Sequence, residues 1–196
     1  QGTGPAGSIE LNVGPLVVPG DAQISSSSTG PGPVTGAAGT ITVQGLSGAG
    51  TLATSVTLQN GQLLTSATGS GAGGSIVVHT PTVTLYQATI SATTAAGDAG
   101  GLTFTDAKSF TSTNSSLTTE ATTGKGGTIA IGSAGATSIN LTNTTISATV
   151  KGGSKAGGDV TLTAPNVMLT GGAITAATQG TGPAGSIELN VGPLVV

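Results

Sequence analysis

Residues 73–93 read GGSIVVHTPTVTLYQATISAT, and this stretch decides the fold. A glycine pair leads into the apolar pair Ile76–Val78, and the apolar pair Val83–Leu85 follows. Ile90 belongs to a third alternating segment behind a small residue. Alternation of apolar and polar residues over three to five positions is typical of a strand with one buried face. Strands this short are not stable alone, so the stretch predicts a unit that stacks on copies of itself.

The same pattern recurs along the whole chain. A glycine precedes an apolar-x-apolar strand seven times, at spacings of 26 to 35 residues, at Gly7, Gly39, Gly74, Gly101, Gly127, Gly158 and Gly185. A second signature then follows. It has an apolar residue at position i, another apolar residue at i+2, a small residue at i+5 and an aliphatic residue at i+7. It is Val17, Pro19, Ala22 and Ile24 in the first unit, Val83, Leu85, Ala88 and Ile90 in the third, and Phe110, Ser112, Ser115 and Leu117 in the fourth, where the match is poorest.

Stacking such units about 4.8 Å apart pairs each backbone group with the units above and below and lines the aliphatic side chains into interior columns. The sequence therefore predicts an all-β fold, a right-handed parallel β-helix (β-solenoid) of about six coils with three short strands each and no caps. The predicted inward columns are Ile9, Leu11, Ile41, Val43, Ile76, Val78, Val83, Leu85, Ile90, Ile129, Ile131, Ile139, Leu141, Ile146, Val160, Leu162, Val167, Leu169, Ile174, Ile187 and Leu189.

A longer repeat lies over the short one. Residues 1–18 recur without change as residues 179–196, an offset of 178. We expect residues 1–196 to be one solenoid segment, with 1–178 as one long tandem period of six units, about 29 Å long at the usual strand spacing. Uncapped ends that carry the same sequence predict continuation of the rod, either within one polypeptide or by head-to-tail association of the chain with itself.

The composition excludes some classes of partner. Only 6 % of the residues are charged, and the four cationic residues are lysines, with no arginine. Such a chain does not neutralise a run of phosphates, which argues against a nucleic-acid partner. It has no cysteine for disulfides or thiolate metal sites, and no apolar run long enough to span a membrane. No signal peptide is visible either.

The repeat style resembles that of a known family. The phrases Gly73-Gly74-Ser75-Ile76, Val83-Thr84-Leu85 and Ala88-Thr89-Ile90-Ser91-Ala92-Thr93 resemble the passenger repeats of filamentous-haemagglutinin-like exoproteins, the large two-partner-secretion adhesins of bacteria. The resemblance covers essentially the whole chain and is one of style, without a catalytic motif. It implies a right-handed β-helical rod carried to the outer surface through a partner transporter. The family's N-terminal secretion domain does not occur in these residues.

The leading expectation is a structural module of a secreted or cell-surface bacterial fibre or adhesin stalk, without enzymatic activity. The alternative is an adhesive module. The segments 25–35 and 44–55 are insertions relative to the shortest units, and loops of this kind are where solenoids place specificity. We expect both to bulge outward, where they would bind surface glycans or a protein receptor.

Residues with chemistry are few and scattered. A polysaccharide-acting enzyme is the remote alternative, with Asp98 and Glu120 at neighbouring corners as its acid pair. Asp98 and Asp159 are also weak calcium candidates, because the repeated glycine–aspartate nonapeptide of calcium-binding β-rolls is absent. His79 is the only histidine and is expected at a strand edge on the surface. We expect no cofactor and no transition-metal site, since such a site needs several ligands.

Two surface features remain. Asn114, Asn140 and Asn143 each begin an Asn-x-Ser/Thr triplet, which in a threonine-rich chain also arises by chance. An ice-binding face needs a regular threonine ladder. The expected outward column of the first strand is too irregular for one, with the residues Glu10, Thr42, Val77, Thr103, Ala130 and Thr161.

Overall fold

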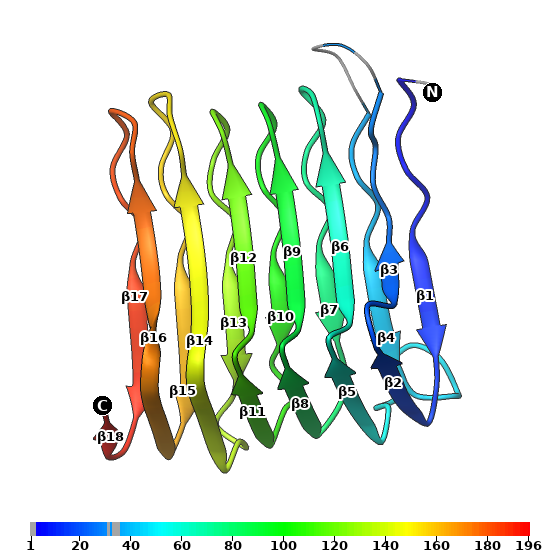
Figure 1. Cartoon of the computed structure of the whole chain (residues 1–196), viewed down its shortest axis with the longest axis vertical. Helices are drawn as coiled ribbons and strands as arrows, with labels where there is room; N and C mark the ends of the chain where they lie inside the picture. Colours follow the sequence, from blue (N-terminus) through cyan, green and yellow to red (C-terminus); the bar gives the residue numbers. More distant parts are fainter. Residues whose placement is uncertain (1–2, 31, 33–35) are drawn as a thin grey trace.

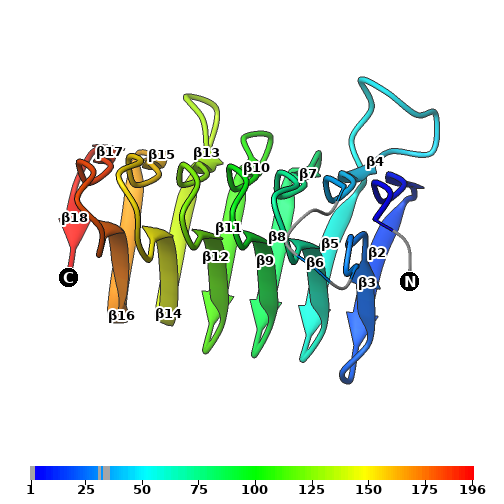
Figure 2. The same ribbon diagram turned by 90° about the horizontal axis from the view of Figure 1, so that it is seen from above.

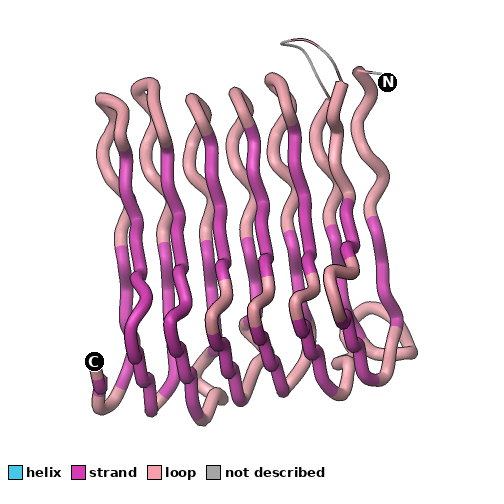
Figure 3. The backbone as a smooth tube through the Cα atoms, viewed as in Figure 1, coloured by secondary structure: helices cyan, strands magenta, loops and turns pink. Residues whose placement is uncertain are grey.

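The computed structural model describes residues 3–30, 32 and 36–196, and these residues form a parallel β-solenoid (Figure 1). The successive turns lie side by side along the axis, and none of the described residues is helical (Figure 3). The predicted all-β solenoid is therefore confirmed. The solenoid has about seven turns rather than six, because residues 179–196 already pair as strands of a further turn.

One face is a seven-stranded sheet that takes one strand from each turn. Its strands are β1 (Ile9–Asn12), β4 (Ile41–Gln44), β7 (Ile76–Val78), β10 (Leu102–Phe104), β13 (Ile129–Gly132), β15 (Val160–Ala164) and β17 (Ile187–Val191). We number the turns one to seven by these strands, and each turn begins with the glycine-rich segment ahead of its strand. All neighbours are parallel and in register, so that Ile9 pairs with Ile41 and Val160 with Ile187.

The second sheet contains two ladders that meet at a corner (Figure 2). One ladder contains β2 (Pro15–Pro19), β5 (Ser55–Gln59), β8 (Thr82–Tyr86), β11 (Ser109–Thr113) and β18 (Leu194–Val195). The other contains β3 (Gln23–Ser25), β6 (Gln62–Ala67), β9 (Thr89–Thr94) and β12 (Ser116–Ala121). In turns five and six a single long strand takes part in both ladders: β14 (Ser138–Val150) in turn five and β16 (Asn166–Thr178) in turn six. The expectation of three separate strands in each turn is therefore wrong for these two turns.

Left-handed residues make the corner between these two ladders. Each of the first six turns has at least one, and the column consists of Gly20, Asn60, Gln87, Asn114, Asn143 and Gly171, with φ between 47° and 68°. Glycine adopts this conformation freely and asparagine tolerates it better than other residues. Asn143 also donates its side-chain Nδ2 to Asn114 Oδ1 at 3.2 Å. The two asparagines therefore bond from turn to turn.

Turn one departs from the predicted register. Val17 was expected inside, but Leu16 pairs with Val56 and Val18 with Leu58, which leaves Val17 58 % exposed. The segment from Val18 to the next inward residue is one residue longer than in turn two, and the corner absorbs the extra residue by placing both Gly20 and Asp21 in the left-handed region. The spacing pattern alone cannot distinguish a one-residue shift from a one-residue bulge.

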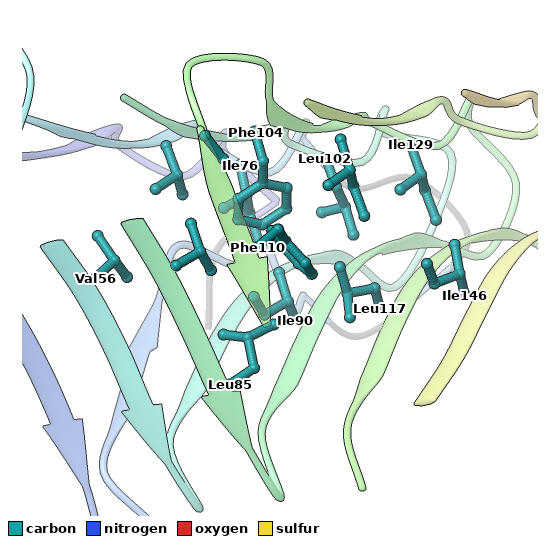
Figure 4. Close-up of a cluster of buried hydrophobic side chains, with 14 of the residues drawn as sticks. Val56, Ile76, Leu85, Ile90, Leu102, Phe104, Phe110, Leu117, Ile129 and Ile146 are labelled. Atoms are coloured by element: carbon teal, nitrogen blue, oxygen red, sulfur yellow. The ribbon is translucent and has the colours of Figure 1, made fainter. Parts of the chain in front are cut away.

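The core is a continuous stack of apolar side chains between the sheets. Figure 4 shows Ile76 and Leu102 of one sheet pointing toward Ile90 and Leu117 of the other. Fifteen of the predicted inward residues are fully buried: Ile41, Val43, Ile76, Val78, Val83, Leu85, Ile90, Ile129, Ile131, Ile139, Leu141, Ile146, Val160, Leu162 and Val167. In turns one, six and seven, Ile9, Leu11, Leu169, Ile174 and Leu189 are partly buried, and Ile187 is 46 % exposed.

Turn four fills its core differently from its neighbours. Phe104 and Phe110 pack edge to face with ring centroids 5.3 Å apart, an arrangement that aromatic pairs favour. Ser112 takes an inward position that is apolar in other turns, and its hydroxyl lies 2.9 Å from that of Thr144 in turn five. The poor match of this turn to the signature therefore reflects two aromatic rings and a buried hydroxyl pair, both accommodated inside the solenoid.

A column of glycines brings the turns together ahead of the first sheet. A Cβ added to Gly127 would overlap the carbonyl oxygen of Gly100, and one added to Gly158 would overlap that of Gly127. In turn four the column contains Gly100, not the predicted Gly101, which stands one position later. Only glycine permits this approach of backbone to backbone.

We predict that Gly127→Ala destabilises the solenoid by about 1–3 kcal/mol or more, because the new methyl group forces adjacent turns apart. Gly135→Ala is the matched control, since an added Cβ there meets its first neighbour only at 3.9 Å. Urea unfolding followed by circular dichroism measures both. Equal stability of the two variants would contradict the close-packed column.

Candidate functional site

The segment between β4 and β5 is the most prominent loop among the residues that the structure describes. It projects from the solenoid beyond the other connections (Figure 2). Gly45 N–H donates to Thr51 O at 3.0 Å, and Thr51 Oγ1 donates to Gly48 O at 2.6 Å, so the loop is closed on itself. Leu46 is 76 % exposed and Leu52 46 % exposed on this closed scaffold. The outward bulge expected for residues 44–55 is present, and it displays two apolar side chains.

The other predicted loop, 25–35, is described only in part, because residues 31 and 33–35 lie outside the described residues. Its first half does not bulge outward but continues β3 alongside β6, with the Ser26 N–H donating to Leu64 O at 2.9 Å and the Ser28 N–H donating to Ser66 O at 2.8 Å. Ser26 donates its hydroxyl to Gly7 O, and Ser28 donates to Gly4 O at 3.0 Å. The serines at its start therefore bond the backbone of their own turn.

Polar side chains join turn to turn at the position just after the glycine column. Ser75 Oγ accepts the N–H of Gly101 in the next turn at 3.1 Å. Asp159 occupies the same position in turn six, and its Oδ1 accepts both the N–H and the hydroxyl of Ser186, each at 2.8 Å. Asp98, three residues ahead of that position, accepts the N–H of Lys125 at 2.8 Å. Both calcium candidates are thus engaged as hydrogen-bond acceptors between turns.

The electrostatics of Asp159 follow from this geometry. The backbone N–H of Ser186, its hydroxyl and then the positive charge of Lys125 hold the pKa of the Asp159 carboxyl below its ordinary value of 3.8, and burial opposes them only in part. Hydrogen bonds donated to a carboxylate favour its charged form. Asp159 therefore contributes to the contact between turns six and seven as an anion.

The predicted acid pair has two separate sets of partners. Glu120 lies within β12 rather than at a corner, and its Oε1 is 2.8 Å from Lys151 Nζ. Asp98 instead bonds the backbone at Lys125. Among the residues that the structure describes, no three histidine, aspartate or glutamate side chains come together as a metal site would need.

His79 is half exposed just after β7, as expected for a strand edge. Its Nδ1 lies 2.6 Å from Asp106 Oδ2, which follows β10 in the next turn. The three asparagines of the triplets divide by position. Asn114 and Asn143 form part of the left-handed corner, whereas Asn140 lies on β14 between Thr111 and Met168.

One cluster was not found from the sequence. Gln44 is buried at the end of β4, and its Nε2 donates to Glu10 Oε1 at 2.6 Å and to Asn12 Oδ1 at 2.8 Å. The partners are 32 and 34 residues apart in the chain, and only the stacking of turn two on turn one brings them together. Identifying it required the register of Asn12 on Gln44, which the structure supplies.

Comparison with known proteins returned no matching family model, no matching curated protein and no matching solved structure. Across the described ranges, no helix is long and apolar enough to cross a membrane.

The lowered pKa of Asp159 gives a pH prediction. Since its folded pKa lies below 3.8, its contribution is complete above that value and is lost as the pH falls through the folded pKa. We expect the Ser186 amide resonance to titrate with a midpoint below 3.8, and the response to disappear in Asp159→Asn. Ser186→Ala keeps the backbone donor but removes the hydroxyl, and should raise the midpoint. A wild-type midpoint at or above 3.8 would sink this account.

Proposed function

We propose that this chain is a structural repeat module of a secreted or cell-surface bacterial fibre or adhesin stalk, in which turns stack into a long rod. The observation that carries the proposal is the place of the 178-residue repeat in the solenoid. Residues 9 and 187, one period apart, stand at the same position of the first sheet, six turns apart. A tandem array of this period would continue the rod without a change of register.

Other features support a structural role. The apolar core runs through the stack as one cluster, and the acidic side chains of Asp98 and Asp159 bond the next turn. Few charges and a uniform, in-register backbone suit a fibre that spans distance. The resemblance in repeat style to bacterial two-partner-secretion exoproteins points to the outer surface of a bacterium and to export through a partner transporter.

The test is to change the number of periods in the source organism. Removing one 178-residue period should shorten the surface fibre by about 29 Å, six turns at the usual strand spacing. Antibodies raised against the purified chain should label the cell exterior, with fibre length read by electron microscopy. Label confined to the cell interior, or a length independent of period number, would refute the proposal.

A second candidate function is adhesion through the β4–β5 loop. The specific observation is that a closed, projecting loop displays Leu46 and Leu52 to solvent, an arrangement that marks many recognition loops on rigid scaffolds. The occupant would be a surface glycan or a protein receptor with an apolar patch.

Replacing both leucines with serine should reduce adhesion of chain-coated beads to immobilised polysaccharides and matrix proteins at least tenfold, while the rod stays folded. Met168→Ser is the matched control, because Met168 is 41 % exposed on β16 in turn six, four turns along the rod from this loop. Unchanged adhesion of the double variant, or an equal loss in the control, would exclude the loop as the contact.

A further inference from the structure

Turns one and seven are built from the same sequence, yet each is covered on a different side. Residues 179–196 pack on turn six, whereas residues 3–18 are covered by turn two. Ile187 pairs with Val160, and its counterpart Ile9 pairs with Ile41. The structure therefore shows how this sequence contacts the turn before it, in residues 179–196, and how it contacts the turn after it, in residues 3–18.

The glycines of turn one leave open the side that turn seven uses. A Cβ added to Gly182 or Gly185 would overlap backbone atoms of turn six. The counterparts Gly4 and Gly7 have nothing within 4 Å of the same added atom. Glycine is required at these positions only where the backbone of another turn lies against them. The first turn thus has the shape that seats on turn six.

The polar groups are complementary in the same way. Ser186 donates its N–H and its hydroxyl to Asp159, whereas the counterpart Ser8 accepts the Thr40 N–H on its Oγ at 3.3 Å. A serine hydroxyl donates one hydrogen bond and accepts others. One serine can therefore bond Asp159 below and Thr40 above at the same time.

We propose that residues 3–18 of a second copy of this chain replace residues 181–196 on turn six, so that copies join head to tail by exchange of an identical segment. Ser8 of the incoming copy then bonds Asp159, and its Ile9 lies on Val160. Because the two segments have the same sequence, the contacts broken are the contacts formed, the condition under which domain exchange costs little. This inference rests on the proposed rod function and names the partner and register of its joints.

The charges oppose the simpler alternative, in which turn one of one copy stacks on turn seven of another. That register sets Glu10 directly on Glu188, and like charges directly opposite on neighbouring strands destabilise their pairing. In the exchanged joint Glu10 instead lies on Thr161, as Glu188 does within the chain. It also keeps the hydrogen bond from Gln44 Nε2 at 2.6 Å. The exchanged register is the one we expect.

Paired cysteines distinguish the two registers, since the chain has no cysteine of its own. Asn12→Cys with Thr163→Cys reports the exchanged joint. The two sites are five turns apart within one chain, about 24 Å, beyond the reach of a disulfide, so only two copies can be linked. Asn12→Cys with Asn190→Cys reports simple stacking. We expect oxidised dimers and longer ladders to rise with protein concentration, at least tenfold more abundant in the first variant.

Thr163→Cys with Asn190→Cys is the control, because these residues are register partners within one chain. Its disulfide locks residues 179–196 on turn six, and the locked chain should stay monomeric in sedimentation until it is reduced. Absence of intermolecular linkage in the first variant, or preferential linkage in the stacking variant, overturns the exchange. If the Thr163→Cys–Asn190→Cys disulfide forms but no intermolecular linkage is found, only the exchange is excluded. The solenoid and its proposed rod function then stand, because an array within one polypeptide needs no exchange.

Discussion

The approach of backbone to backbone along the glycine column is the constraint on which the rest of the structure depends. At Gly100, Gly127 and Gly158 the chain passes so near the carbonyl oxygen of the preceding turn that an added Cβ would overlap it. The absence of side chains here lets the turns close to the spacing at which the parallel ladders form their hydrogen bonds. The core is thin, and stacking must supply the order that a compact globule obtains from large side chains.

Polar groups inside and between the turns serve the same stacking. Among the described residues, no buried side-chain nitrogen or oxygen lacks a hydrogen-bond partner. Thr65 and Thr119 point inward and donate their hydroxyls to the carbonyl oxygens of Gly74 and Gly127, so that polar residues on the inner face join consecutive turns instead of weakening the core. The Asp159 carboxylate likewise accepts the backbone N–H of Ser186 in the next turn. Asp98 and Asp159, which from the sequence were calcium candidates, both accept hydrogen bonds from the backbone of the next turn.

A solenoid with this organisation separates its scaffold from any recognition role. Neighbouring turns keep the same strand register, whereas the long β4–β5 loop belongs to turn two and closes on itself through Gly45 and Thr51. Recurrence of a whole period would therefore repeat this loop once every six turns, at regular distances along a rod. A fibre built in this way combines length with evenly spaced contact points, which is why the structural and the adhesive hypotheses are compatible.

The sequence by itself determined the parallel solenoid and most of its inward columns, because alternation with period two and recurrent glycines are local properties that a stack of short strands satisfies. The left-handed corner residues were identified only in the structure. Most of the columns are buried as predicted, from Ile41 to Val167. Tertiary structure alone decided the register of turn one, where Val18 rather than Val17 points inward, since a one-residue bulge at Gly20 and Asp21 is invisible to spacing. It also decided which polar groups meet. Gln44 reaches Glu10 and Asn12, and Asp159 reaches Ser186, only because residues about one turn apart in the chain are placed at one strand spacing.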